Sequence, residues 1–277
     1  MRTAYPTNNL EEYFWYVLLG SGPDFEHRPQ LYHYTKLENK PLILKNDCIH
    51  LRLTRADSFA DTQEIQHIVM VMEDACTNCL HNGVIDEVFY DVINHAIAST
   101  EAILSEYRKY YIFCTSSNGD SAYLKEYYAC RGNDEGLIIG FQQLAFQDYQ
   151  WIVEKDREQL EDGIYLYDVI YNKAELQNAF SVVIETLYQM RDQDTRELPT
   201  IQKTIHTLVT MYSLAYKDPE FSDEEETRLI VDASKLPPKD EIKNTDDRYY
   251  YLDLPHWALY ALYKVSRDDN RCSYIEM

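Results

Sequence analysis

The alternation of apolar and polar residues predicts a series of short strands. The run Cys48 to Thr54 is the clearest, because Ile49, Leu51 and Leu53 fall on one side of an extended chain. A run that is apolar along most of its length, typical of a strand buried on both faces, covers Gly136 to Phe141. Further strands are expected at Gln30 to Thr35, Tyr111 to Thr115, Ile164 to Tyr171, Arg228 to Val231 and Arg248 to Leu254.

Helical spacing of apolar residues separates these strands. Long helices are predicted at Thr62 to Leu80, Ile85 to Tyr110, Leu176 to Met190 and Leu198 to Tyr216, and shorter ones at Asn9 to Leu19, Leu37 to Lys45 and Asp120 to Cys130. Trp257 to Lys264 fits either a helix or a strand. Because helical blocks interrupt the strands instead of alternating with them one for one, the pattern predicts an α+β fold with a mixed, mainly antiparallel core sheet.

This pattern also predicts the domain organisation. Residues 1–30 are expected to form an N-terminal helical segment, and residues 31–277 a single α+β domain. Helical insertions are expected within that domain at about 62–110 and 173–216.

Composition places the chain among folded proteins. Its 277 residues are 45% hydrophobic and 13% aromatic, enough to bury a large core and to exclude a disordered class. The 25 tyrosines combine apolar rings with hydroxyl groups, which suits half-buried walls and polar pockets.

The net charge of -21 makes nucleic acid an unfavourable partner, because phosphate binding requires a basic face. A basic protein is the more natural partner, although the charge also serves solubility alone. The six cysteines lie within apolar or helical patterns, and neither a long apolar segment nor a signal peptide is present. We therefore expect a cytoplasmic protein without a membrane segment. The sequence does not indicate an oligomeric state.

A metal site is not expected. Cys76 and Cys79 have a spacing that zinc sites use, with His81 close by. No second cysteine or histidine pair lies at a matching distance along the chain, so four ligands cannot be assembled locally.

Two polar motifs nearly two hundred residues apart could carry chemistry. The first places His33 among the aromatic residues Tyr32 and Tyr34, followed by Thr35. The second runs from Glu224 to Val231, and in a strand it would point Glu224, Glu226 and Arg228 to one face.

Each motif also has an ordinary structural explanation. The acidic run could begin a helix, in which Glu224 pairs with Arg228 four residues later. His33 could be a strand histidine with no chemical role. The loops around Asp61 and Ser116 could bind a ligand, or could simply cap the helices that follow them. Phosphate-loop, nucleophile-elbow and zinc-protease motifs are absent from the sequence.

Taken in order, several segments resemble the bacterial and phage domain-of-unknown-function family 2971. They are Leu31 to Thr35, Ile43 to Lys45, Phe59 to Glu64, Phe113 to Ser116 with Asp120 and Tyr127, Gly136 to Phe141, Val169 to Tyr171, and Lys217 to Leu229. The resemblance spans most of residues 31–255. The chain has Ala60-Asp61-Thr62 where the family tends to have Asn-Asp-Pro, and it lacks the family's tryptophan near Leu124.

The arrangement is similar to that of ADP-ribosyltransferases, in which a histidine lies on the first core strand and a late glutamate in a Glu-x-Glu motif. This resemblance implies His33 and Glu226 as the catalytic pair acting on NAD, without a metal. It also implies that Thr35 supports the histidine and that Tyr127 or Tyr128 flanks the nicotinamide. The polar motifs and loops themselves add further candidates for substrate binding, which are Tyr32, Tyr34, Asp61, Ser116, Glu224 and Arg228. An ionised glutamate would stabilise the positive charge that develops on the ribose when nicotinamide leaves.

Two functions follow as hypotheses. The first is an NAD-dependent ADP-ribosyltransferase-like enzyme or NAD glycohydrolase that acts in conflict between phage and host. The alternative is a non-enzymatic acidic protein that binds or sequesters a basic protein or a nucleotide-like ligand.

Overall fold

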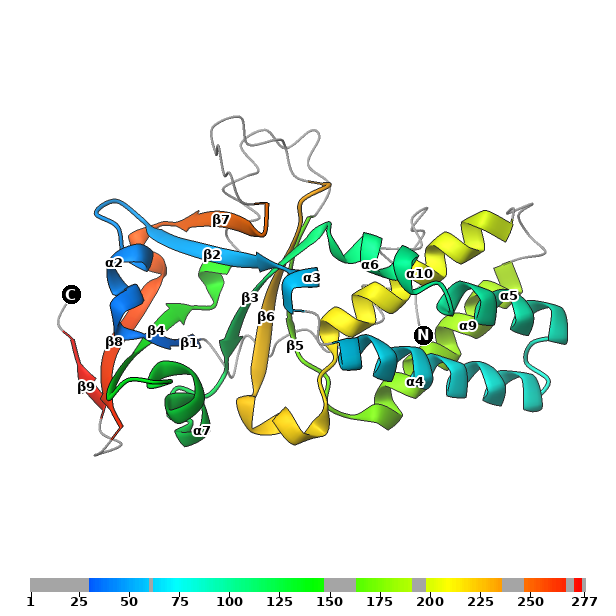
Figure 1. The fold of residues 1–277 in the computed structure, drawn as a ribbon, viewed down its shortest axis with the longest axis horizontal. Coiled ribbons are helices and arrows are strands. Elements are labelled where there is room, and N and C mark those ends of the chain that lie inside the picture. The colour runs from blue at the N-terminus through cyan, green and yellow to red at the C-terminus, as the bar shows by residue number, and fades with distance from the viewer. Residues whose placement is uncertain are drawn as a thin grey trace, which may run out of the picture. The chain divides into compact units, whose positions relative to one another are not determined.

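The computed structural model describes residues 30–59, 62–146, 163–190, 198–235, 247–267 and 272–275 (Figure 1). The expected helical segment at residues 1–30 lies outside this range apart from residue 30, and so does Asp61.

The chain divides into two compact units. Of the described residues, the first unit holds 62–108, 170–190 and 198–219, and the second holds the others. The segments in which helical insertions are expected, at about 62–110 and 173–216, are helical over most of their described length. They fall mainly in the first unit.

The first unit is built from amphipathic helices. They are α4 (Thr62–His81), α5 (Glu87–Ile97), α6 (Thr100–Tyr107), α9 (Lys173–Met190) and α10 (Leu198–Ala215). The expectation of one continuous helix from Ile85 to Tyr110 is wrong. Ser99 leaves the helical conformation, with φ -86° and ψ 73°, and becomes the N-cap of α6. Serine favours such positions because its hydroxyl competes for backbone groups within a helix.

The second unit contains all nine of the described strands, joined in one sheet. The strands are β1 (Gln30–Lys36), β2 (Ile49–Arg55), β3 (Tyr110–Ser116), β4 (Glu135–Gln142), β5 (Ile164–Asp168), β6 (Glu226–Asp232), β7 (Tyr249–Leu254), β8 (Leu259–Ser266) and β9 (Cys272–Tyr274). Their main order is β5-β6-β3-β1-β4-β8-β9, and every pairing between them is antiparallel. The predicted α+β fold with a mainly antiparallel sheet is thereby confirmed.

The sheet forks at β3. This strand pairs with β1 at a single position, Tyr32 with Ser116, whereas farther along it pairs with β2 through Ile112 and Tyr111. β2 then continues to β7, so that β2 and β7 form a separate branch (Figure 1). One core cluster draws residues from both branches, including Leu31 of β1 and Leu51 of β2.

The opposite face of β1 and β4 is covered by a short helical segment. It consists of α7 (Ala122–Leu124) and η2 (Lys125–Ala129), and η2 is a π-helical turn. Leu124 and Ala129 pack there against Tyr34 and Ile138. Gly136 lets η2 approach β4 closely, because a Cβ at this position would lie 2.5 Å from the Ala129 carbonyl carbon.

Three elements near the C-terminal half differ from expectation. β5 ends at Asp168, short of the predicted Tyr171. The ambiguous Trp257 to Lys264 begins in the 3-10 helix η5 (His256–Ala258) and continues as β8. β9 was not predicted, because three residues are too few to show a period.

Candidate functional site

The two polar motifs of the sequence meet on the sheet of the second unit. Tyr32 of β1 lies opposite Ser116 of β3, and Ser116 lies opposite Glu226 of β6. Residues paired in this way point to the same face of a sheet. Segments nearly two hundred residues apart therefore supply one row of side chains.

Glu226 forms a buried ion pair with Arg228 on this face. Nε and an Nη atom of the guanidinium donate to the two carboxylate oxygens, over 3.0 and 3.2 Å. Both side chains are buried. Burial is the largest influence on the pKa of Arg228 and lowers it, but the charge and hydrogen bonds of Glu226, together with Cys114 and Tyr167, outweigh burial, and the net pKa is raised. The guanidinium in turn favours the charged form of the carboxylate.

This geometry decides between the two explanations of the acidic motif. The strand interpretation is confirmed for Glu226 and Arg228, which share a face two residues apart in β6. The helix-start interpretation is wrong, because no helix begins at Glu224 and residues 226–232 form a strand. Glu224 ends the 3-10 helix η4 (Pro219–Glu224) and accepts a hydrogen bond from a partner outside the motif.

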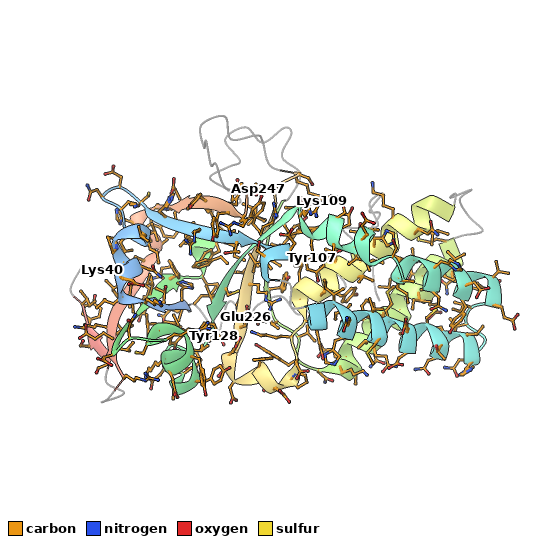
Figure 2. All side chains as sticks on the ribbon, in the orientation of Figure 1. Lys40, Tyr107, Lys109, Tyr128, Glu226 and Asp247 are labelled. Atoms are coloured by element: carbon orange, nitrogen blue, oxygen red, sulfur yellow. The ribbon has the colours of Figure 1, made fainter. Side chains whose placement is uncertain are left out.

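That partner is Tyr128, whose hydroxyl donates to Oε1 of Glu224 over 2.8 Å. Glu224 is buried, whereas the Tyr128 side chain is 41% exposed. Burial, followed by the charges of Glu224 and Glu226, raises the pKa of Tyr128, so the phenol stays protonated and remains a donor. Figure 2 labels Tyr128 and Glu226, and the charge of Glu226 contributes to the raised pKa of Tyr128. The partly exposed ring therefore contacts one buried carboxylate and lies within electrostatic range of a second.

The loop after β3 holds the acidic segment in place. Ser116 donates its hydroxyl to the Glu224 carbonyl over 2.7 Å and accepts from the Asn118 backbone N–H over 3.0 Å. The Ser117 N–H donates to the Glu225 carbonyl. Glu225 has a φ of 43°, and its carboxylate accepts from the Ser117 hydroxyl and the Asn118 amide. These bonds fix the turn from which Glu224 and Glu226 project.

His33 does not join this group on the same face. It follows Tyr32 in β1, so its side chain alternates to the other side, where its ring centroid lies 4.5 Å from that of Phe113 with the two rings tilted by 31°. Phe113 lies opposite Leu229, and both belong to the core cluster between the branches. Nδ1 lies 2.9 Å from the Cys114 carbonyl and donates to it, because a carbonyl only accepts. Burial lowers the pKa of His33, which favours the neutral ring.

The other residues predicted to bind substrate each have a different neighbour in the structure. The hydroxyl of Tyr34 donates to the Asn118 carbonyl over 2.6 Å, which ties it to the loop after β3. Tyr32 donates to Gln30, and Thr35 accepts from Asn39. Tyr127 is 53% exposed and packs its ring against Tyr123.

Cys114 was not among the site residues predicted from the sequence. It lies directly opposite Arg228 in the β3–β6 pairing, and its charge interaction contributes to the pKa of Arg228. Alternation within Tyr111 to Thr115 places Cys114 on the same face as Ser116, which was a signal available in the sequence. The pairing of β3 with β6, which brings Cys114 opposite Arg228, could not be predicted from the sequence.

Within the described residues, no three His, Cys, Asp or Glu side chains gather in a way that could hold a metal ion. A search of the same part of the chain finds no helix with the length and apolar character needed to cross a membrane. The polar groups that surround Glu226 include a second carboxylate, a guanidinium and a phenol. Such groups can bind sugar hydroxyls and stabilise a positive charge.

Comparison with known protein families gives a match over part of the chain. Residues 127–229 match the model of a family described as "Protein of unknown function (DUF2971)". The family resemblance predicted from the ordered motifs is confirmed over this segment, which includes Tyr128, Glu224, Glu226 and Arg228. No curated protein and no solved structure matches the chain.

Proposed function

From the match to this family of unknown function and from the geometry of the carboxylate site, we propose that the protein acts on NAD. It breaks the bond between nicotinamide and ribose and transfers ADP-ribose to an acceptor, or to water. The observation that supports this proposal is the Glu226 carboxylate, buried, paired with Arg228 and bordered by the partly exposed Tyr128 ring.

The chemistry follows from the charges. Nicotinamide leaves C1′ of the ribose as a neutral molecule, taking the electrons of the broken bond. Positive charge develops on the ribose, and an ionised carboxylate held in a dry, fixed position stabilises it. The acceptor then forms a bond to C1′ and loses its proton to solvent. We assign the stabilising carboxylate to Glu226.

The surrounding residues have supporting roles in this proposal. Arg228 keeps Glu226 charged and fixes its orientation through two hydrogen bonds. Tyr128 offers the face of its ring to a planar base, and its hydroxyl holds Glu224. Ser116 positions the turn that carries both glutamates. His33 faces the other side of the sheet and is a positioning residue at the fork.

The test is release of free nicotinamide. The pure protein is incubated with NAD, with and without lysate of a bacterial host, and nicotinamide is measured by chromatography. Glu226→Gln and Glu226→Asp should each lower the rate by at least about 100-fold, because one removes the charge and the other displaces it. Glu226→Asp is the more informative variant, because it keeps a negative charge next to Arg228.

Glu225→Gln is the matched control. Glu225 is one residue away and exposed, and a glutamine can still accept from Asn118. This variant should retain the wild-type rate. Thermal unfolding of each variant checks that it folds. A folded Glu226→Asp protein with the wild-type rate, or wild-type protein that never releases nicotinamide, would reject the proposal.

A further inference from the structure

The Tyr128–Glu224 hydrogen bond joins two segments that each carry an exposed aromatic side chain. Tyr127 precedes Tyr128 in η2 and is 53% exposed, and Phe221 precedes Glu224 in η4 and is 38% exposed. The hydrogen bond between Tyr128 and Glu224 joins these two segments. Large exposed aromatic side chains grouped in this way mark a binding surface more often than single exposed residues do.

The same two segments carry negative charge. Glu126 is exposed beside Tyr127, and Asp223 is exposed beside Glu224. Within η2, the ammonium group of Lys125 is buried and bound to Asp120. We call Glu126, Tyr127, Phe221 and Asp223 the acid–aromatic surface.

We propose that the acid–aromatic surface binds a lysine- and arginine-rich segment of a protein. Carboxylates attract such a segment over a distance, and aromatic faces bind ammonium and guanidinium groups directly. Nucleic acid is excluded by the sign of the charge. If the proposed NAD chemistry holds, this segment belongs to the acceptor.

Binding is measured without NAD, which separates this inference from the catalytic one. The probe is a short, fluorescently labelled peptide rich in lysine and arginine, and its fluorescence anisotropy is followed as protein is added. Glu126→Lys/Asp223→Lys should weaken binding at least about tenfold, because it places cations where the peptide needs anions. Phe221→Ala should also weaken binding, by a smaller factor.

The matched control is Glu73→Lys/Glu185→Lys. Both residues are exposed on helices of the first unit, and this double variant changes the net charge by the same amount. It should leave the Kd within about twofold of wild type, because neither residue belongs to the acid–aromatic surface. A labelled peptide rich in glutamate should not bind.

The inference is overturned if the two double variants weaken binding equally, because the attraction would then belong to the whole molecule. It is also overturned if Glu126→Lys/Asp223→Lys binds as wild type does. Nicotinamide release by this variant, without peptide, should match wild type. Local peptide binding by a protein that never releases nicotinamide would support the surface and reject only the catalytic proposal.

Discussion

At the scale of single residues, Glu225 shows how the turn before β6 stores strain. Its φ of 43° is a left-handed conformation that a residue with a Cβ adopts at a cost. The turn persists because the loop after β3 binds both the carbonyl and the carboxylate of Glu225. Its neighbour Glu226 enters the strand directly, so the strained residue sets the direction of the proposed catalytic carboxylate.

A pair of variants isolates this strain. Glu225→Ala and Glu225→Gly both lose the carboxylate bonds, but only glycine relieves the left-handed conformation. We expect Glu225→Gly to be more stable than Glu225→Ala by about 1 kcal/mol in urea unfolding. If the two variants are equally stable, or alanine is the more stable, the turn does not hold the strain we assign to it.

His33 should contribute to the pH dependence of stability. Its pKa is lowered in the folded protein by burial. Below the ordinary pKa of about 6.5, the unfolded chain therefore takes up a proton before the folded one does. Stability should fall as the pH drops from 6.5 towards the lowered value.

His33→Asn tests this contribution, because asparagine can still donate to the Cys114 carbonyl but does not titrate. The free energy of unfolding should depend less on pH between about 6.5 and 5.5 in the variant than in wild type. Nicotinamide release should stay within a few-fold of wild type, since the imidazole faces away from Glu226. A rate as low as that of Glu226→Asp would show instead that the histidine contacts the ribose.

At the scale of elements, the positions of strands were predicted better than the ends of helices or the pairing of strands. β2 has strict alternation, and its predicted and observed ranges differ by one residue at each end. The helix predicted from Ile85 to Tyr110 is interrupted at Ser99, because an apolar stripe does not show where the backbone leaves the helical conformation. Local patterns give the identity of an element more securely than its ends.

The site was predictable only in part for a related reason. Period two placed Glu226 and Arg228 on one face, which the ion pair confirms. The row that joins Tyr32, Ser116 and Glu226 depends on the register of three strands distant in sequence. The choice of Tyr128 over Tyr127 as the partner of Glu224 depends on the π-helical turn of η2. Neither the register of distant strands nor a π-helical turn can be predicted from a local sequence pattern.

The packing of η2 on β4 can be tested at Gly136. A methyl group there would meet the Ala129 backbone at 2.5 Å, a distance that backbone atoms cannot relieve by a side-chain rotation. Gly136→Ala should therefore cost about 2–3 kcal/mol of unfolding free energy, in the upper part of the range for overpacked sites. It should also disturb Tyr128, which η2 carries.

Gly140→Ala in the same strand is the control. A methyl group there meets the Tyr32 ring at 3.3 Å and its other nearest neighbours at 3.4 Å, contacts that small shifts can relieve. Its cost should stay below about 1 kcal/mol. Equal costs for the two glycines would mean that η2 can move away from β4 freely.

At the scale of the whole molecule, the net charge of -21 should make stability depend on salt. With 47 acidic and 26 basic residues, repulsion among like charges opposes the compact state. Salt screens exposed charges, whereas the buried Glu226–Arg228 pair is screened much less. Exposed pairs such as Lys173 with Asp74 contribute little, so their weakening should not offset the relief of repulsion.

Thermal unfolding at pH 7 should therefore shift to higher temperature as sodium chloride is raised from about 0.05 to 0.5 M, over which the screening length falls below about 10 Å. The same titration near pH 4.7, the isoelectric point, should show a much smaller shift, because the net charge is then close to zero. Comparing the two pH values separates charge screening from other effects of salt on protein hydration. A melting temperature that falls with salt at pH 7 would show that attractive ion pairs, rather than overall repulsion, dominate the electrostatics of the fold.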